Sequence, residues 1–233
     1  MDTGASPDLA ERLAGVAGRV ADAARSAGRS PGDITTIVVT KFHPVSLIRE
    51  LAELGVTNFG ESRHQEAQAK VAELAGTDFA SVGATWHFIG QLQSKKARHV
   101  REYADVIHAV DRESLVASLG GAGRPVDVFL QVNLTDDPDR GGAQPHDVQG
   151  LAARIQSTPG LHLKGLMTVA PLGEEPRRAF ATVRALSETL RRDIPEASAL
   201  SMGMSGDFEE AIAEGATHLR IGTAITGNRP TLG

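Results

Sequence analysis

The stretch that decides the fold is ITTIVVTK, residues 34–41. Residues 34–40 form a largely apolar run with the length of a buried strand. Lys41 closes that run, so the sequence predicts that the end of a buried strand delivers an amine. Burial lowers the pKa of a lysine amine toward the free base, which condenses with aldehydes. A solvated loop lysine is the alternative.

Strand-like and helix-like segments alternate along the rest of the chain. The strand-like segments are 34–40, 56–59, 85–90, 106–110, 126–133, 161–168, 198–202 and 217–221. Helical patterns lie between them, at 45–54, 61–75, 94–103, 112–119, 145–157, 176–192 and 207–214. This alternation predicts an α/β protein, a single (β/α)8 TIM-type barrel.

The pattern leaves no full helix after the last strand, where Pro230 interrupts residues 224–233. An apolar stripe at helical spacing precedes the first strand, formed by Leu9, Leu13, Val16, Val20 and Ala24. We therefore expect an extra N-terminal helix over about residues 8–27, in the outer ring near the eighth strand. The barrel is expected over about 34–229, within one domain that spans 1–233.

Composition narrows the class of protein. The formal net charge of -5 argues against a nucleic-acid surface, which normally carries a basic excess. The chain has no cysteine, which excludes disulfides, zinc–thiolate sites and thiol catalysis. Residues 1–12 lack the features of a signal peptide, and no apolar run approaches the roughly 20 residues of a membrane span. We expect a cytoplasmic protein that binds neither nucleic acid nor membrane.

The carboxyl ends of the strands carry the chemistry of a barrel. Lys41 follows the first strand, Asn58 ends the second and Met167 ends the sixth. We expect these three residues to line one mouth. Met167 is either plain core or a surface on which a cofactor ring packs.

Two turns rich in glycine and hydroxyl groups follow the last two strands. They have the sequences SMGMSGD, residues 201–207, and RIGTA, residues 220–224. Glycine allows close backbone approach, and exposed N–H groups with hydroxyls bind anions. Barrels commonly bind phosphate at these turns, so one phosphate is expected to contact Gly222, Thr223 and either Ser201 or Ser205. Arg220 comes from a strand that neighbours the first in a closed barrel, and can share a ligand with Lys41.

Several blocks of sequence, in order from about residue 34 to 229, resemble one family. These blocks are VVTK (38–41), FGESR (59–63), WHFIGQLQ (86–93), GLM (165–167), LSMGMS (200–205) and RIGTA (220–224). They resemble the pyridoxal phosphate homeostasis protein family, the single-domain relatives of the barrel of alanine racemase. The resemblance implies pyridoxal 5'-phosphate held as a Schiff base on Lys41. It also implies a role in vitamin B6 and amino-acid homeostasis with little or no catalytic turnover.

Arg220 discriminates between mechanisms. The resemblance to the Arg-x-Gly turn of alanine racemase implies that Arg220 faces the ring nitrogen of the cofactor. Arginine can only donate a hydrogen bond there, which discourages use of the ring as a strong electron sink. The alternative is an inward arginine paired with a barrel carboxylate. We expect Tyr103 and His87 to have structural roles, although His87 has the right chemistry for a base.

Three classes of function remain after these arguments. The first is the homeostasis protein, with pyridoxal phosphate as its ligand, apo pyridoxal enzymes as its acceptors and a monomeric state. The second is a fold-type III pyridoxal enzyme, such as an amino-acid racemase. The third is a barrel enzyme that acts on a sugar phosphate through its lysine.

Overall fold

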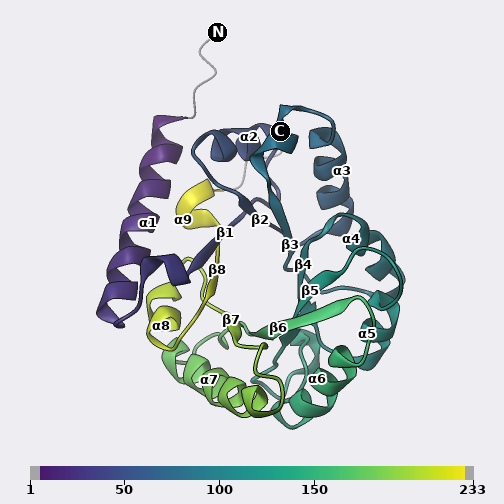
Figure 1. Ribbon diagram of the computed structural model, residues 1–233. Helices are drawn as coiled ribbons and strands as arrows, with labels where there is room; N and C mark the ends of the chain where they lie inside the picture. The colour runs from purple at the N-terminus through teal and green to yellow at the C-terminus, as the bar shows by residue number, and fades with distance from the viewer. Residues whose placement is uncertain (1–5, 229–233) are drawn as a thin grey trace.

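The computed structural model describes residues 6–228. Eight parallel strands form a closed barrel in sequence order, and the last strand pairs with the first. Helices surround this ring of strands (Figure 1). The predicted TIM-type barrel is therefore confirmed, while the expectation of one domain over the whole chain stays a prediction.

Each predicted strand is present, with ends that shift by a few residues. The strands are β1 (Thr35–Val39), β2 (Asn58–Glu61), β3 (Thr85–Phe88), β4 (Val106–Val110), β5 (Val126–Gln131), β6 (Leu161–Met167), β7 (Ala199–Ser201) and β8 (His218–Ile221). The helices are α1 (Pro7–Ser26), α2 (Val45–Glu53), α3 (His64–Leu74), α4 (Ala97–Tyr103), α5 (Glu113–Leu119), α6 (Val148–Gln156), α7 (Pro176–Asp193), α8 (Phe208–Ala213) and α9 (Thr223–Thr226).

The second strand corrects one prediction. We expected residues 56–59 to form it and Asn58 to end it, but the strand runs from Asn58 to Glu61. The glycine at position 60 lies within the strand, where a Cβ would come to 2.9 Å from Cγ2 of Ile37 on the neighbouring strand β1. Glycine thus permits close packing in the middle of β2. Asn58 therefore begins the strand, at the barrel end opposite the mouth.

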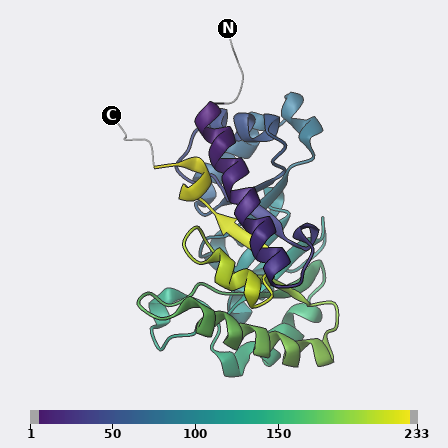
Figure 2. The same cartoon turned by 90° about the vertical axis from the view of Figure 1, so that its left-hand side faces the viewer.

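The N-terminal helix α1 occupies the outer ring beside β8, as the sequence predicted. Its predicted apolar stripe is buried at Leu9, Val16, Val20 and Ala24, while Leu13 is partly buried. The Nε of Arg12 donates to the carbonyl of Ile225 in α9, at 2.7 Å. Figure 2 shows α1 lying across the same side of the molecule as α8 and α9. The predicted barrel end at residue 229 lies outside the described residues.

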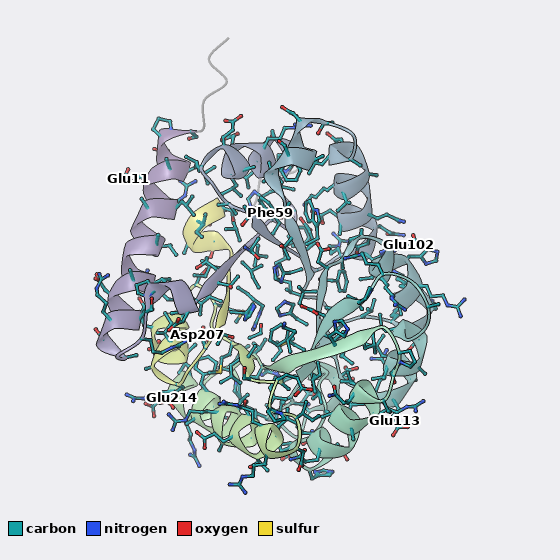
Figure 3. All side chains as sticks on the ribbon, in the orientation of Figure 1. Glu11, Phe59, Glu102, Glu113, Asp207 and Glu214 are labelled. Atoms are coloured by element: carbon teal, nitrogen blue, oxygen red, sulfur yellow. The ribbon has the colours of Figure 1, made fainter. Side chains whose placement is uncertain are left out.

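The barrel interior holds both apolar and polar side chains, whereas the layer between strands and helices holds the main apolar core. The interior apolar cluster consists of Val106, Ala109, Phe129 and Met167, with Ala199 packed against it. Histidine, serine and arginine side chains also lie inside the ring of strands, which Figure 3 shows filled with side chains. In the part of the chain that the structure describes, no helix has the length and apolar character needed to cross a membrane.

Candidate functional site

Lys41 lies just past the carboxyl end of β1. Side chains alternate between the two faces of a strand, and Val38 belongs to the core between strands and helices. Ile37 and Val39 therefore face the interior, and Lys41 follows two residues after the strand ends. Its side chain is partly buried rather than enclosed. Lys41 thus lies at the mouth of the barrel, and its role as the reacting amine stays a prediction.

Arg220 lies deep inside the barrel, where β8 pairs with β1 in register with Ile37. Its side chain donates through Nη1 to Ser201 Oγ at 2.6 Å and through Nη2 to the carbonyl of Thr168 at 2.8 Å. Neither partner is a carboxylate. Burial lowers the pKa of Arg220 to about 10, and the charge of Asp207 opposes that shift. Arg220 therefore stays a cation near neutral pH, with only hydrogen-bond donors to offer.

A chain of hydrogen bonds crosses the interior from Arg220 to Asn58. Ser201 Oγ lies 2.8 Å from His108 Nδ1, His108 Nε2 lies 3.0 Å from His87 Nδ1, and His87 Nε2 lies 3.0 Å from Asn58 Oδ1. The amide oxygen of Asn58 can only accept, so His87 Nε2 donates to it. With both rings neutral, His108 Nε2 then donates to His87 Nδ1, and the Ser201 hydroxyl donates to His108 Nδ1. Both imidazoles, of His108 and His87, are therefore protonated at Nε2.

Burial keeps both of these histidines neutral. Desolvation lowers the pKa of His87 to about 3 and holds the pKa of His108 well below its ordinary value. Because both ring nitrogens of His87 have partners, its role is that of a hydrogen-bonded interior histidine. The chain fixes the Ser201 hydroxyl as an acceptor for Arg220, and so fixes the guanidinium itself.

The turns after β7 and β8 are joined at the mouth. The backbone N–H of Arg220 donates to the carbonyl of Gly203, at 3.0 Å, and the N–H of Ala224 donates to Ser205 Oγ, at 3.4 Å. Gly203 has a φ of +93°, a conformation that favours glycine. The predicted proximity of the two turns is therefore confirmed.

Gly222 and Thr223 stand beside the end of β1. Gly222 precedes α9, and a Cβ on it would lie 3.6 Å from Cβ of Val39. Thr223 is the first residue of α9 and is exposed. Both residues thus lie at the end of the barrel where the backbone leads to Lys41.

The other predicted site residues lie at different depths along the barrel. Met167 is 2% exposed and belongs to the interior apolar cluster. Ser201 is fully buried and engaged by Arg220, whereas Ser205 lies on the turn at the mouth. Asn58 lies at the amino-terminal end and contacts His87 instead of the mouth.

Sequence reasoning missed His108 and the carbonyl of Thr168. His108 interrupts the strand VIHAV, in which every residue is buried. A histidine between valine, isoleucine and alanine in such a strand was the available signal, because a buried imidazole needs hydrogen-bond partners. The partners themselves, 21 and 93 residues away, carry no local pattern.

Comparisons with known proteins agree with this geometry. Residues 22–230 match the family model described as alanine racemase, N-terminal domain. A pyridoxal phosphate homeostasis protein of Corynebacterium glutamicum is 41% identical over 87% of this chain and 93% of its own length. The chain belongs to the pyridoxal phosphate homeostasis protein family. The family member of Pseudomonas aeruginosa is 40% identical, over 95% of this chain and 96% of its own length.

Solved structures of other proteins share the fold of this chain. The structure of PipY from Synechococcus elongatus with PLP bound is 38% identical, with a TM-score of 0.79 over 94% of this chain and 100% of PipY. Alanine racemase of Corynebacterium glutamicum is 15% identical, with a TM-score of 0.71 over 94% of this chain and 62% of the racemase. The second likeness shows a shared fold and nothing more.

Proposed function

We propose that the protein binds pyridoxal 5'-phosphate at the mouth of the barrel, with Lys41 as the lysine of the Schiff base. One observation carries the proposal. Lys41 follows β1, Arg220 is buried on the neighbouring strand β8, and the two joined turns after β7 and β8 suit a phosphate. The solved relative PipY, whose structure is described as having PLP bound, supports the same ligand.

The residues present fit this cofactor. Ser205, Gly222 and Thr223 offer hydroxyl and backbone groups for a phosphate at the mouth. Arg220, already oriented by Ser201, offers its remaining donors to an acceptor such as a pyridine nitrogen. Bound there, the cofactor would supply an aldehyde that captures amines and a ring that can accept electrons.

The remaining predicted residues take secondary parts in this proposal. Met167 would form the apolar floor beneath a ring at the mouth, because it ends β6 within the interior cluster. Ser201 and Asn58 would act through Arg220. Ser201 is its direct partner, and Asn58 is the last residue of the interior chain of hydrogen bonds. We assign the phosphate contact to Ser205 rather than Ser201, because the Ser201 hydroxyl is committed inside the barrel.

We further propose that the protein holds and releases the cofactor instead of turning over substrates. This would serve vitamin B6 and amino-acid homeostasis, with apo pyridoxal enzymes as acceptors. The names of its relatives support that role. A cytoplasmic location and a monomeric state remain part of the same proposal.

A visible spectrum of the purified protein tests the covalent attachment. We expect that one equivalent of pyridoxal phosphate turns the protein yellow, and that borohydride removes the colour while leaving the cofactor attached after denaturation. Cofactor that remains bound but is released on denaturation after borohydride would contradict a Schiff base.

Substitution of Thr223 tests the phosphate site. Thr223→Ala should weaken affinity for pyridoxal phosphate by about tenfold or more and leave affinity for pyridoxal almost unchanged, because a hydrogen bond to a charged group is worth roughly 1.5–3 kcal/mol. Equilibrium titrations of both ligands measure this difference. Thr189→Ala, at an exposed position on α7, is the matched control. Equal loss for both ligands would show that Thr223 does not contact the phosphate.

A further inference from the structure

A buried ionic cluster lies directly behind Lys41. Lys70 of α3 is 6% exposed, and its Nζ donates to Glu61 Oε1 and Glu66 Oε1, each at 2.7 Å. The same amine donates to the carbonyl of Thr40 at 2.8 Å. Glu61 is only 1% exposed, at the end of β2. A lysine and two carboxylates are thus gathered on the side of β1 that faces the helices.

This cluster holds both peptide groups that flank Lys41. On one side, Lys70 binds the carbonyl of Thr40, whose hydroxyl also donates to Glu61 Oε1 at 2.7 Å. On the other side, the backbone N–H of Phe42 donates to Glu66 Oε1 at 2.5 Å. The orientation of the Lys41 backbone is therefore fixed from both directions.

The backbone after Lys41 adopts an unusual conformation. Phe42 has a φ of +67° and is the only non-glycine residue with a positive φ among residues 6–228. Side chains with a Cβ rarely adopt this conformation, and it persists where surrounding contacts enforce it. The hydrogen bond from Phe42 to Glu66 is such a contact, and it turns the chain sharply just after the lysine.

Stability alone does not account for this cluster. Buried ion pairs can often be replaced by apolar residues without loss of stability, so their presence is weak evidence for a stabilising role. Here the hydrogen bonds converge on the residues before and after one lysine at the mouth. Such convergence fits the requirement that a reacting amine be held close to its productive position.

We infer that Lys70, Glu61 and Glu66 are positioning residues that set the Lys41 amine for condensation with an aldehyde at the barrel mouth. This inference rests on the proposed function. In the condensation, Lys41 Nζ bonds to the aldehyde carbon, and the aldehyde oxygen leaves as water with the two amine hydrogens. The cluster touches neither reactant and acts only through the Lys41 backbone.

Two substitutions of Glu66 test whether this residue positions Lys41. Glu66→Leu removes the acceptor for the Phe42 N–H, whereas Glu66→Gln keeps an oxygen that can accept it. Glu73→Leu, at an exposed position on α3, controls for loss of a carboxylate from the same helix. For each variant, stopped-flow absorbance gives the rate of condensation with pyridoxal phosphate. Equilibrium titration gives the affinity for pyridoxine 5'-phosphate, which has no aldehyde.

We expect Glu66→Leu to slow condensation by about tenfold or more, the scale of one lost hydrogen bond to a charged group. Glu66→Gln should recover most of the rate, and all variants should bind pyridoxine phosphate as the parent does. An unchanged rate in Glu66→Leu, or an equal loss of rate and of pyridoxine phosphate affinity, would overturn the positioning role. If the parent binds pyridoxine phosphate but never condenses with the aldehyde, the proposed function itself fails.

Discussion

Mild acid is expected to destabilise this protein strongly, because histidines inside the barrel are held neutral. Burial lowers the pKa of His87 to about 3, lowers the pKa of His218 to about 4, and keeps the pKa of His108 well below its ordinary value. In the unfolded chain a histidine takes up a proton near pH 6.5. Between that pH and about 4, the unfolded state therefore binds more protons than the folded state.

The sign of the effect follows from this difference in proton binding. Stability rises with pH wherever the unfolded state binds more protons. The full contribution is present above pH 6.5 and is lost as the pH falls below it. Protonation of His87 in the unfolded state alone would lower the free energy of unfolding by roughly 2 kcal/mol between pH 6.5 and pH 4.5. His108 adds a loss in the same direction, and the total is large beside a typical stability of about 5–15 kcal/mol.

Urea unfolding at several pH values between 7 and 4.5 measures this loss. His87→Gln should reduce the dependence of the unfolding free energy on pH by about one proton, because glutamine does not titrate. His162→Gln serves as the matched control, since His162 is exposed on β6. Unfolding free energies that are the same at pH 7 and pH 4.5 would contradict the neutral interior histidines.

The loaded protein is expected to exchange the α-hydrogen of amino acids far more slowly than a dedicated racemase. Arg220 is a buried cation with only donors to offer, whereas strong use of a pyridoxal ring as an electron sink benefits from an acid at the ring nitrogen. A second acid–base group is also needed to deliver a proton to the opposite face. Loss of such a group alone costs a factor of about 100 to 10,000 in rate.

The two candidates that the sequence offered for that group do not fit. Both ring nitrogens of His87 are engaged, and its pKa is lowered to about 3. Tyr103 ends α4 in the outer layer of helices, where its hydroxyl lies 3.4 Å from His64 Nδ1. Burial also raises the pKa of Tyr103, so it is a poor base.

Incubation with L-alanine in deuterated buffer tests this expectation. Mass spectrometry follows deuterium at the α-carbon, and chiral chromatography follows the ratio of enantiomers. We expect exchange no faster than a small multiple of that catalysed by free pyridoxal phosphate. Rapid, saturable inversion that disappears in Lys41→Ala would instead establish a racemase.

The sequence predicted the fold because strand-like segments alternate with helical patterns, although β2 (NFGE) and β8 (HLRI) are not purely apolar runs. It also placed Lys41 and the two turns at one mouth, since carboxyl ends of parallel strands meet at one end of a barrel. It misplaced Asn58 because the expected strand over 56–59 was set two residues too early, whereas β2 runs from Asn58 to Glu61. Local pattern does not reveal that the glycine at position 60 packs closely against Ile37 of the neighbouring strand β1.

Residues that act through contacts distant in sequence were beyond sequence reasoning. The choice between Ser201 and Ser205 depends on which hydroxyl meets Arg220 inside the barrel, and four residues of separation do not decide it. Lys70 was not singled out in the sequence, where it is one charged residue within the helical pattern over 61–75. Its contact with the carbonyl of Thr40, 30 residues away, appears only in the folded chain.

Mapping of the borohydride-reduced adduct tests the central claim most directly. The protein is loaded with pyridoxal phosphate, reduced and digested, and the modified peptide is identified by mass spectrometry. We predict one pyridoxyl group on Lys41, and no specific adduct in a folded Lys41→Ala variant. The segment after β3 carries two further lysines, Lys95 and Lys96. An adduct found mainly on either of them, or one that persists unchanged in Lys41→Ala, would contradict the assignment.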